Sequence, residues 1–144
     1  MVNADLVAAK LAELATRLAQ VRRHVPGTAA ELAASNDALD LVSFNLMLAV
    51  QVCADVSSHV IADEGWTLAR SLAEGFDRLA EHGVIEPDVA ASLRKAVKVR
   101  NIVAHGYAGI DAEHLYAGAT AGLGPIEAFA AQVSAWIAKR AAPG

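Results

Sequence analysis

Hydrophobic residues recur at helical spacing along most of this chain. Between residues 4 and 25 they follow one another at alternating intervals of four and three, which places them on one face of a helix, and Asn3 precedes them as an N-terminal cap. Pro26 and Gly27 end the pattern. The stripe consists of Val7, Leu11, Leu14, Leu18, Val21 and Val25. It predicts a helix that packs against a partner helix, in the same chain or in another copy.

A second predicted helix starts near Thr28 or at Asn36 and runs to about Ile61. Its apolar residues point to nearly every side of the helix axis, and a helix of that kind is buried on all sides. In a chain of this size the pattern indicates one of two arrangements. The helix is central and flanked by the others, or its second face packs against another subunit.

Further helices follow along the rest of the chain. Single apolar stripes predict helices over residues 65–81 and 87–105, the second of which opens with Pro87 in its first turn. A weaker helix is expected between residues 111 and 123. The last helix should follow the break at Gly124-Pro125.

The composition agrees with this helical pattern. Hydrophobic residues make up 55% of the 144 residues but aromatic residues only 5%, and a chain rich in alanine and leucine favours helices over strands. No segment alternates like a strand, and no linker or repeat marks a domain boundary. We therefore expect a single all-α domain over residues 1–144, an up-and-down helical bundle of four to six helices.

Several functional classes are excluded by what the sequence lacks. No apolar run approaches the roughly 20 residues that cross a bilayer, and the N-terminus does not read as a signal peptide, so we expect a cytoplasmic protein without a membrane partner. Cys53 is a single cysteine among apolar neighbours, which predicts a buried, unreactive thiol. The five histidines are scattered, so neither a metal site nor a cofactor is predicted.

The net charge of −4 and the isoelectric point of about 5.7 argue against a protein that coats nucleic acid by charge alone. One segment departs from this balance. Arg94, Lys95, Lys98 and Arg100 place four cations in seven residues without an acid among them. Such a run is either a solvated helix face or a local set of contacts to RNA phosphates, with Arg94, Lys95 and Lys98 as the contact residues.

Residues 100–107 combine an arginine, an amide, an imidazole and a phenol at the end of a predicted helix. Because a helix advances by about 100° per residue, Asn101 and His105 share a face, whereas Arg100 and His105 lie about 140° apart. Arg100 and His105 therefore cannot easily reach one small group from a straight helix. Either His105 lies beyond the regular helix, or the arginine of one helix meets the histidine of another across a dimer.

These residue types suit the cleavage of RNA without a metal. An imidazole can take a proton from the ribose 2′-hydroxyl or give one to the leaving oxygen, while a guanidinium stabilises the charge on the phosphoryl group. The same residues also suit structural roles. His105 could cap the helix, Arg100 could be solvated, and Tyr107 could be a packing residue.

The segment Arg100-Asn101-x-x-x-His105-x-Tyr107 resembles the motif of the HEPN superfamily, and specifically of the HepT toxins of two-component toxin–antitoxin systems. Their mark is Arg, four residues, His, one residue and Tyr, and all three positions match. The segments Ser43-Phe44-Asn45-Leu46 and Ile61-Ala62-Asp63-Glu64-Gly65-Trp66 are also similar to earlier helices of that family. The resemblance thus covers most of the chain.

The resemblance implies a metal-independent endoribonuclease that acts as a homodimer, with Arg100 and His105 of both copies lining a cleft. Asn101 would position His105 or the phosphate. The resemblance also implies a partner, an MntA-type minimal nucleotidyltransferase antitoxin, which neutralises the toxin by AMPylation of Tyr107. The alternative function is a non-catalytic helical binding subunit that recruits or positions a nucleotidyltransferase.

Overall fold

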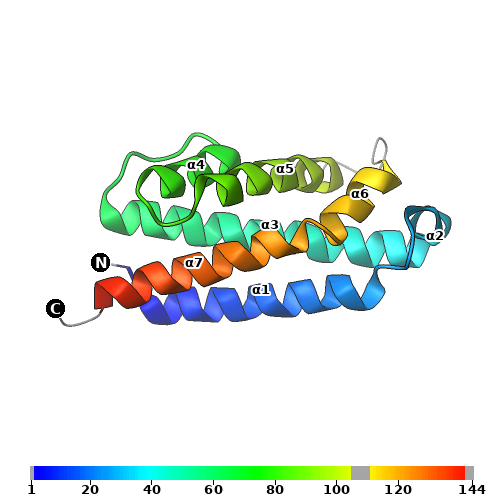
Figure 1. Cartoon of the computed structure of the whole chain (residues 1–144), viewed down its shortest axis with the longest axis horizontal. Helices are drawn as coiled ribbons and strands as arrows, with labels where there is room; N and C mark the ends of the chain where they lie inside the picture. The colour runs from blue at the N-terminus through cyan, green and yellow to red at the C-terminus, as the bar shows by residue number, and fades with distance from the viewer. Residues whose placement is uncertain (1, 105–110, 142–144) are drawn as a thin grey trace.

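The computed structural model describes residues 2–104 and 111–141 of the chain. Within these ranges there is no strand, and five longer helices form a bundle with two short helices at one end (Figure 1). The predicted all-α bundle is confirmed. The helices are α1 (Ala4–His24), α2 (Ala29–Ala34), α3 (Asn36–Glu64), α4 (Leu72–Glu81), α5 (Pro87–Ala104), α6 (Ala112–Ala119) and α7 (Leu123–Ala141).

Helix α3 is the centre of the bundle, as the sequence predicted. It packs against each of the other six helices. By length and hydropathy α3 is also the one helix among the described residues that could cross a bilayer, contrary to the expectation that no segment is apolar enough. However, 56% of its most apolar window is buried inside the bundle. Its apolar character is therefore that of a core helix.

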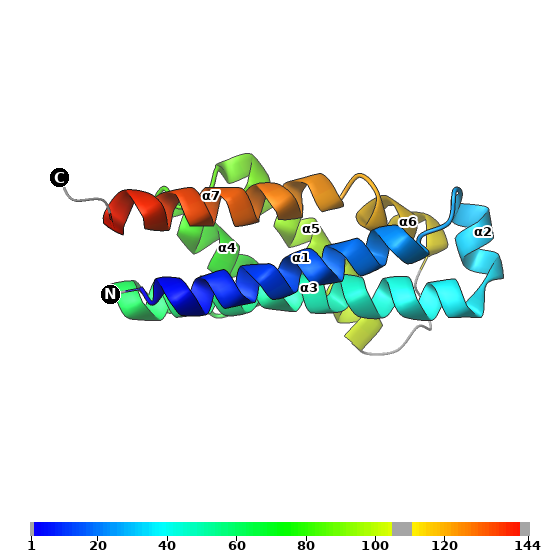
Figure 2. The same ribbon diagram turned by 90° about the horizontal axis from the view of Figure 1, so that it is seen from below.

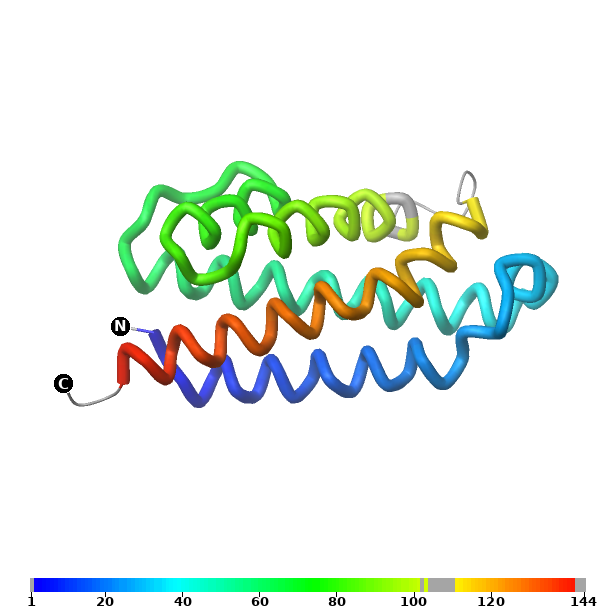
Figure 3. The backbone as a smooth tube through the Cα atoms, viewed as in Figure 1, coloured from blue at the N-terminus to red at the C-terminus, as the bar shows by residue number. Residues whose placement is uncertain are grey.

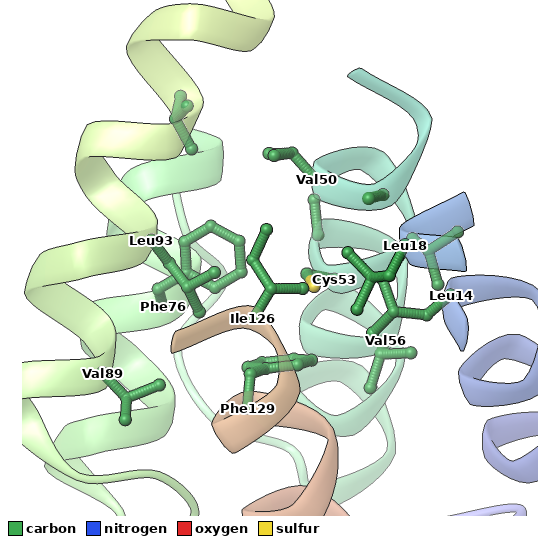
Figure 4. Packing of buried hydrophobic residues seen from close by; sticks show 14 of the residues in the cluster. Leu14, Leu18, Val50, Cys53, Val56, Phe76, Val89, Leu93, Ile126 and Phe129 are labelled. Carbon is green, nitrogen blue, oxygen red and sulfur yellow. The ribbon is translucent and has the colours of Figure 1, made fainter. Parts of the chain in front are cut away.

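The hydrophobic core joins side chains from α1, α3, α4, α5 and α7 (Figure 4). Phe76 of α4 and Phe129 of α7 meet edge to face, with their ring centroids 5.9 Å apart. Leu14 of α1 and Leu93 of α5 are also fully buried. Burying aromatic and leucine side chains of this size stabilises a fold by roughly 1.5–3 kcal/mol each, so these contacts fix the helices against one another.

Cys53 lies in the middle of this core and is fully buried, as predicted. Burial disfavours the charged thiolate and raises the pKa of the Cys53 thiol far above its ordinary value. The thiol is therefore protonated at neutral pH, and it is a packing group.

Side-chain caps start most of the helices. Each N-cap side chain accepts a hydrogen bond from a backbone amide two or three residues further on. These N-cap residues are Asn3, Thr28, Ser35, Ser71 and Asp111. Such a cap satisfies an amide that has no partner within its helix and contributes about 1 kcal/mol. Because both Thr28 and Ser35 act as caps, both predicted starts of the second helix are used, one for α2 and one for α3.

The prediction of one helix over residues 65–81 is wrong. Gly65 ends α3 in the left-handed conformation, with φ of 71°, and α4 begins only at Leu72, where Ser71 caps it. Leu68 was predicted to lie in the apolar stripe, but it belongs to the intervening loop and is 69% exposed. The local capping signals at Gly65 and Ser71 therefore override the hydrophobic spacing.

Two smaller differences occur near the C-terminus. The weaker helix predicted between residues 111 and 123 is the short α6. The last helix starts at Leu123, so Gly124 and Pro125 form its first turn and do not precede it. Proline is favoured in a first turn because its missing amide hydrogen has no helical partner there.

The path of α5 determines where the predicted site lies. Figure 2 shows α5 crossing α3, so that the C-terminal end of α5 lies on the far side of α3 from its start. The chain trace in Figure 3 shows the two chain ends together at one end of the bundle, with α2 and α6 at the opposite end. The second half of α5 points toward α6, away from the chain ends.

Candidate functional site

The five predicted site residues that the structure describes lie on α5, from its middle to its last turn. Arg94, Lys95, Lys98 and Asn101 are exposed, whereas Arg100 is half-buried. Helix α5 therefore carries a cationic, solvent-facing surface and one arginine that is turned toward the bundle. The sequence alone did not distinguish Arg100 from its cationic neighbours in this way.

His105 and Tyr107 lie outside the described residues. The predicted placement of Asn101 and His105 on one helix face therefore stays a prediction, and so does the sharing of Arg100 and His105 between two copies.

Arg100 is held by two side-chain amides. One terminal nitrogen of its guanidinium donates to Gln51 Oε1 on α3 at 2.7 Å, and the other donates to Asn101 Oδ1 at 3.1 Å. The Nε atom is buried and has no hydrogen-bond partner among the described residues. Both acceptors are neutral, so neither of these contacts offsets the positive charge of Arg100.

The contact with Gln51 continues into a chain of polar side chains across three helices. Gln51 Nε2 donates to Asp55 Oδ1 at 3.0 Å, one turn further along α3. The other carboxylate oxygen of Asp55 lies 3.7 Å from Lys10 Nζ on α1. Gln51 and Asp55 are not predicted from the sequence, although two polar residues spaced four apart in an apolar helix are a signal for them.

A groove of about 490 Å³ lies between the start of α4 and the cationic surface of α5. It is lined by Ser71, Leu72, Ala73, Ala91, Arg94, Lys95, Val97, Lys98 and Asn101. The groove thus brings together four of the predicted site residues. Arg100 is not among these lining residues, but its guanidinium contacts the side chain of Asn101, which is one of them.

The cations that line the groove differ in their partners. Arg94 forms an ion pair with Asp77 of α4, which offsets its charge. No ion pair is found for Lys95 or Lys98 within the part of the chain that the structure describes. The groove therefore has an excess of positive charge and suits an anionic, extended ligand.

Three of the four histidines that the structure describes have local structural contacts. His59 lies 3.3 Å from Asp63, His114 lies 3.0 Å from Asp111, and His82 stacks on Trp66. Over residues 2–104 and 111–141 there is no group of three or more metal-ligating side chains that could hold an ion. The described part of the site therefore offers positive charges and hydrogen-bond donors to a ligand.

Solved structures share this fold over nearly their whole length. A toxin–antitoxin structure with AMP-PNP matches with a TM-score of 0.85 and 21% identity, covering 91% of this chain and 98% of that chain. A tri-AMPylated Shewanella oneidensis HEPN toxin in complex with MNT antitoxin matches with a TM-score of 0.83 and 22% identity, covering 91% and 98%. The cytosolic protein of unknown function YutE from Bacillus subtilis matches with a TM-score of 0.84 and 15% identity, covering 99% and 96%. At these identities the similarity shows the fold.

The sequence itself places the chain in a family. No curated protein sequence matches it. However, residues 14–133 match the family model described as HepT-like ribonuclease. This match spans most of the chain and includes the helices that carry Arg100 and Gln51. The chain therefore belongs to the HepT-like ribonuclease family.

Proposed function

We propose that this chain is the toxin of a toxin–antitoxin system and acts in the cytoplasm as a metal-independent endoribonuclease. Membership of the HepT-like ribonuclease family supports ribonuclease activity in general. The observation that carries the proposal is the set of contacts of Arg100. Its guanidinium is held by two neutral amide oxygens, and one of them belongs to Asn101, which lines the cationic groove. A guanidinium held in this way keeps its charge for phosphate oxygens.

In this proposal, His105 transfers the protons. It takes the proton from a ribose 2′-hydroxyl, the 2′ oxygen attacks the phosphorus, and the bond from phosphorus to the 5′ oxygen breaks. A second histidine, from another copy of the chain, protonates the leaving 5′ oxygen. Arg100 stabilises the negative charge that builds on the phosphoryl oxygens. The products are a 2′,3′-cyclic phosphate and a 5′-hydroxyl, and no metal takes part.

The groove gives the RNA backbone a place to lie beside the reacting phosphate. Lys95 and Lys98 would contact flanking phosphates. Arg94 would also contact a phosphate, and its ion pair with Asp77 would then be broken. Asn101 lines the groove and contacts Arg100, which suits the positioning of a phosphate. Phosphate contacts of this kind hold a nucleic acid without reading its sequence.

A homodimer would bring two such sites together. Leu41, Phe44, Leu48 and Gln51 are spaced by three, four and three residues on α3, so they share one face of the helix. Leu41 is 40% exposed and Phe44 is 50% exposed, which is unusual for large apolar side chains on the central helix of a bundle. A partner copy on this face would cover the apolar residues and lie next to the residue that holds Arg100.

Phe44→Asp tests this dimer face. Light scattering should give a dimer for the unchanged chain and a monomer for the variant, because a buried charge without a partner strongly disfavours an interface. Leu68→Asp is the matched control, since Leu68 is exposed in a loop away from this stripe, and it should stay dimeric. A monomeric unchanged chain at micromolar concentration would contradict the dimer.

The proposed partner is an MntA-type nucleotidyltransferase that adds AMP to Tyr107. An adduct with a phosphate group next to the motif would pair with Arg100 and occupy the position of the RNA phosphate. Intact mass measured after co-expression should increase in steps of AMP, and peptide mapping should assign them to Tyr107. Neutralisation of an unmodified toxin would show instead that the antitoxin acts by binding.

The experiment that tests the proposed activity uses RNA in the presence of EDTA. The purified chain, shown by intact mass to be unmodified, should cut total bacterial RNA and leave 5′-hydroxyl ends. His105→Ala should lower the rate by about 10²–10⁴-fold, the usual contribution of a general acid or base. Intact RNA, or equal rates for the two proteins, would contradict the proposal and favour a non-catalytic binding subunit.

A further inference from the structure

The side chain that faces Arg100 from α3 is an amide where a carboxylate would give a stronger bond. Gln51 Oε1 accepts from Arg100 at 2.7 Å, and the contact is partly buried. Arginines that only stabilise a fold are commonly paired with acids, as Arg78 is with Glu74 and Glu81 in this chain. A neutral acceptor fixes the guanidinium without neutralising it.

The amide of Gln51 has two unlike ends, and its surroundings decide which end meets Arg100. A carboxylate can only accept hydrogen bonds, so Asp55 binds the Nε2 end at 3.0 Å. The Oε1 end is then turned to Arg100, which can only donate. Asp55 therefore sets the orientation of Gln51, and Lys10, at 3.7 Å, offsets the charge of Asp55.

Along this chain of contacts, the negative charge of Asp55 lies between the cation Lys10 and the neutral Gln51, which in turn contacts the cation Arg100. The acid that orients Gln51 contacts the other end of the same amide group, and it is paired with its own cation on α1. A direct contact between Asp55 and Arg100 would neutralise the guanidinium. With Gln51 between them, the acid orients the contact and Arg100 keeps its charge.

We propose that Gln51 is a positioning residue for Arg100, oriented by Asp55, and that it holds the guanidinium in place with its charge available to the phosphate of the substrate. This inference rests on the proposed ribonuclease function. It assigns a role to a residue on α3, outside the motif on α5. Its defining property is that Gln51 acts only through Arg100.

Gln51→Glu is the most direct test, because the side chain keeps its size and its acceptor but gains a charge. The carboxylate would pair with Arg100 and repel Asp55. Cleavage of a random-sequence RNA oligonucleotide should slow by about 100-fold, mainly in kcat, which is the scale of a displaced catalytic group. Gln132→Glu is the matched control. It makes the same change in a glutamine that accepts from the backbone amide of Glu86, and it should cleave at the rate of the unchanged chain.

A double-mutant cycle separates positioning from general stability. If Gln51 acts through Arg100, Gln51→Glu should add no further loss in a chain that already carries Arg100→Ala. Losses that multiply would overturn the inference. Gln51→Met is a second variant if Gln51→Glu folds poorly. It removes the acceptor, and it should slow cleavage in the unchanged background but not in the Arg100→Ala background.

The proposed function and the proposed role of Gln51 are contradicted by different results. If Arg100→Ala cleaves as fast as the unchanged chain, the proposed function is wrong. If Arg100→Ala is slow and Gln51→Glu is as fast as the unchanged chain, the function stands and the role of Gln51 is overturned. Because Gln51 shares a helix face with the proposed dimer contact, light scattering and thermal unfolding of each variant must show that the compared proteins have the same oligomeric state and are folded.

Discussion

Two clusters in this molecule contain an arginine that binds neighbouring side chains, and they use it differently. The terminal cluster, formed by Glu64, Trp66, His82, Trp136 and Arg140, lies near the chain ends. There Arg140 donates to Glu64 at 2.8 Å and lies 4.6 Å from the ring centre of Trp136. At the end of α5, Arg100 is bound by the amides of Gln51 and Asn101.

The aromatic side chains strengthen the contrast. In the terminal cluster, the rings of Trp66 and His82 stack with their centroids 3.8 Å apart, and Trp136 meets Trp66 edge to face at 6.0 Å. Every side chain of this cluster therefore has a partner within the chain. A charge matched by a carboxylate stabilises the fold, whereas a charge held by neutral groups remains available to a ligand. The chemical type of the partner separates the two roles.

Among the conservative substitutions, the largest expected effect comes from Arg100→Lys, and Arg140→Lys is its counterpart in the terminal cluster. Arg100→Lys should slow RNA cleavage by about 100-fold, because an ammonium group cannot reach both amides and a phosphate as the planar guanidinium can. Arg140→Lys should keep the cleavage rate and change the free energy of unfolding by no more than about 0.5 kcal/mol. Full activity of Arg100→Lys would remove the distinction between the clusters.

A second substitution tests the structural side of the comparison. Trp66→Ala removes the stack with His82 and the contact with Trp136, and it should lower the free energy of unfolding by about 2 kcal/mol. Denaturant unfolding measures this loss. The cleavage rate per folded molecule should not change. A large loss of activity in a folded Trp66→Ala protein would show that the terminal cluster also serves the reaction.

The smallest expected effect concerns the lysines of the groove. In a His105→Ala background, which keeps RNA intact, Lys98→Ala should weaken RNA binding several-fold and reduce the salt dependence of binding by about one phosphate contact. Lys139→Ala is the control, since Lys139 is an exposed lysine in the last turn of α7, near the terminal cluster. Equal effects of the two substitutions would mean that the groove is not the binding surface.

Much of the fold could be predicted because helices leave local signals. The stripe of α1, its cap at Asn3 and the start of α5 at Pro87 depend on neighbouring residues and were predicted correctly. The helix over residues 65–81 was not, because the apolar spacing of Leu68 and Leu72 continues across a boundary set by Gly65 and Ser71. Periodicity alone does not show where one helix ends and another begins.

The site could be predicted only in part, for a similar reason. Arg100 and Asn101 are adjacent in sequence, and the motif pointed to both of them. Gln51 is 49 positions from Arg100, and its role depends on how α3 and α5 cross. The terminal cluster depends in the same way on the packing of α3, α4 and α7. Contacts between distant helices require the tertiary structure.

The measurement that tests the account most directly compares the RNA cleavage rates of Arg100→Ala and Arg140→Ala in EDTA, with unmodified protein. Arg100→Ala should be slower than the unchanged chain by about 10²–10³-fold, the usual cost of removing a group that stabilises the transition state. Arg140→Ala should be as active as the unchanged chain and lose at most about 1 kcal/mol of stability. Equal rates for the two variants would contradict the account.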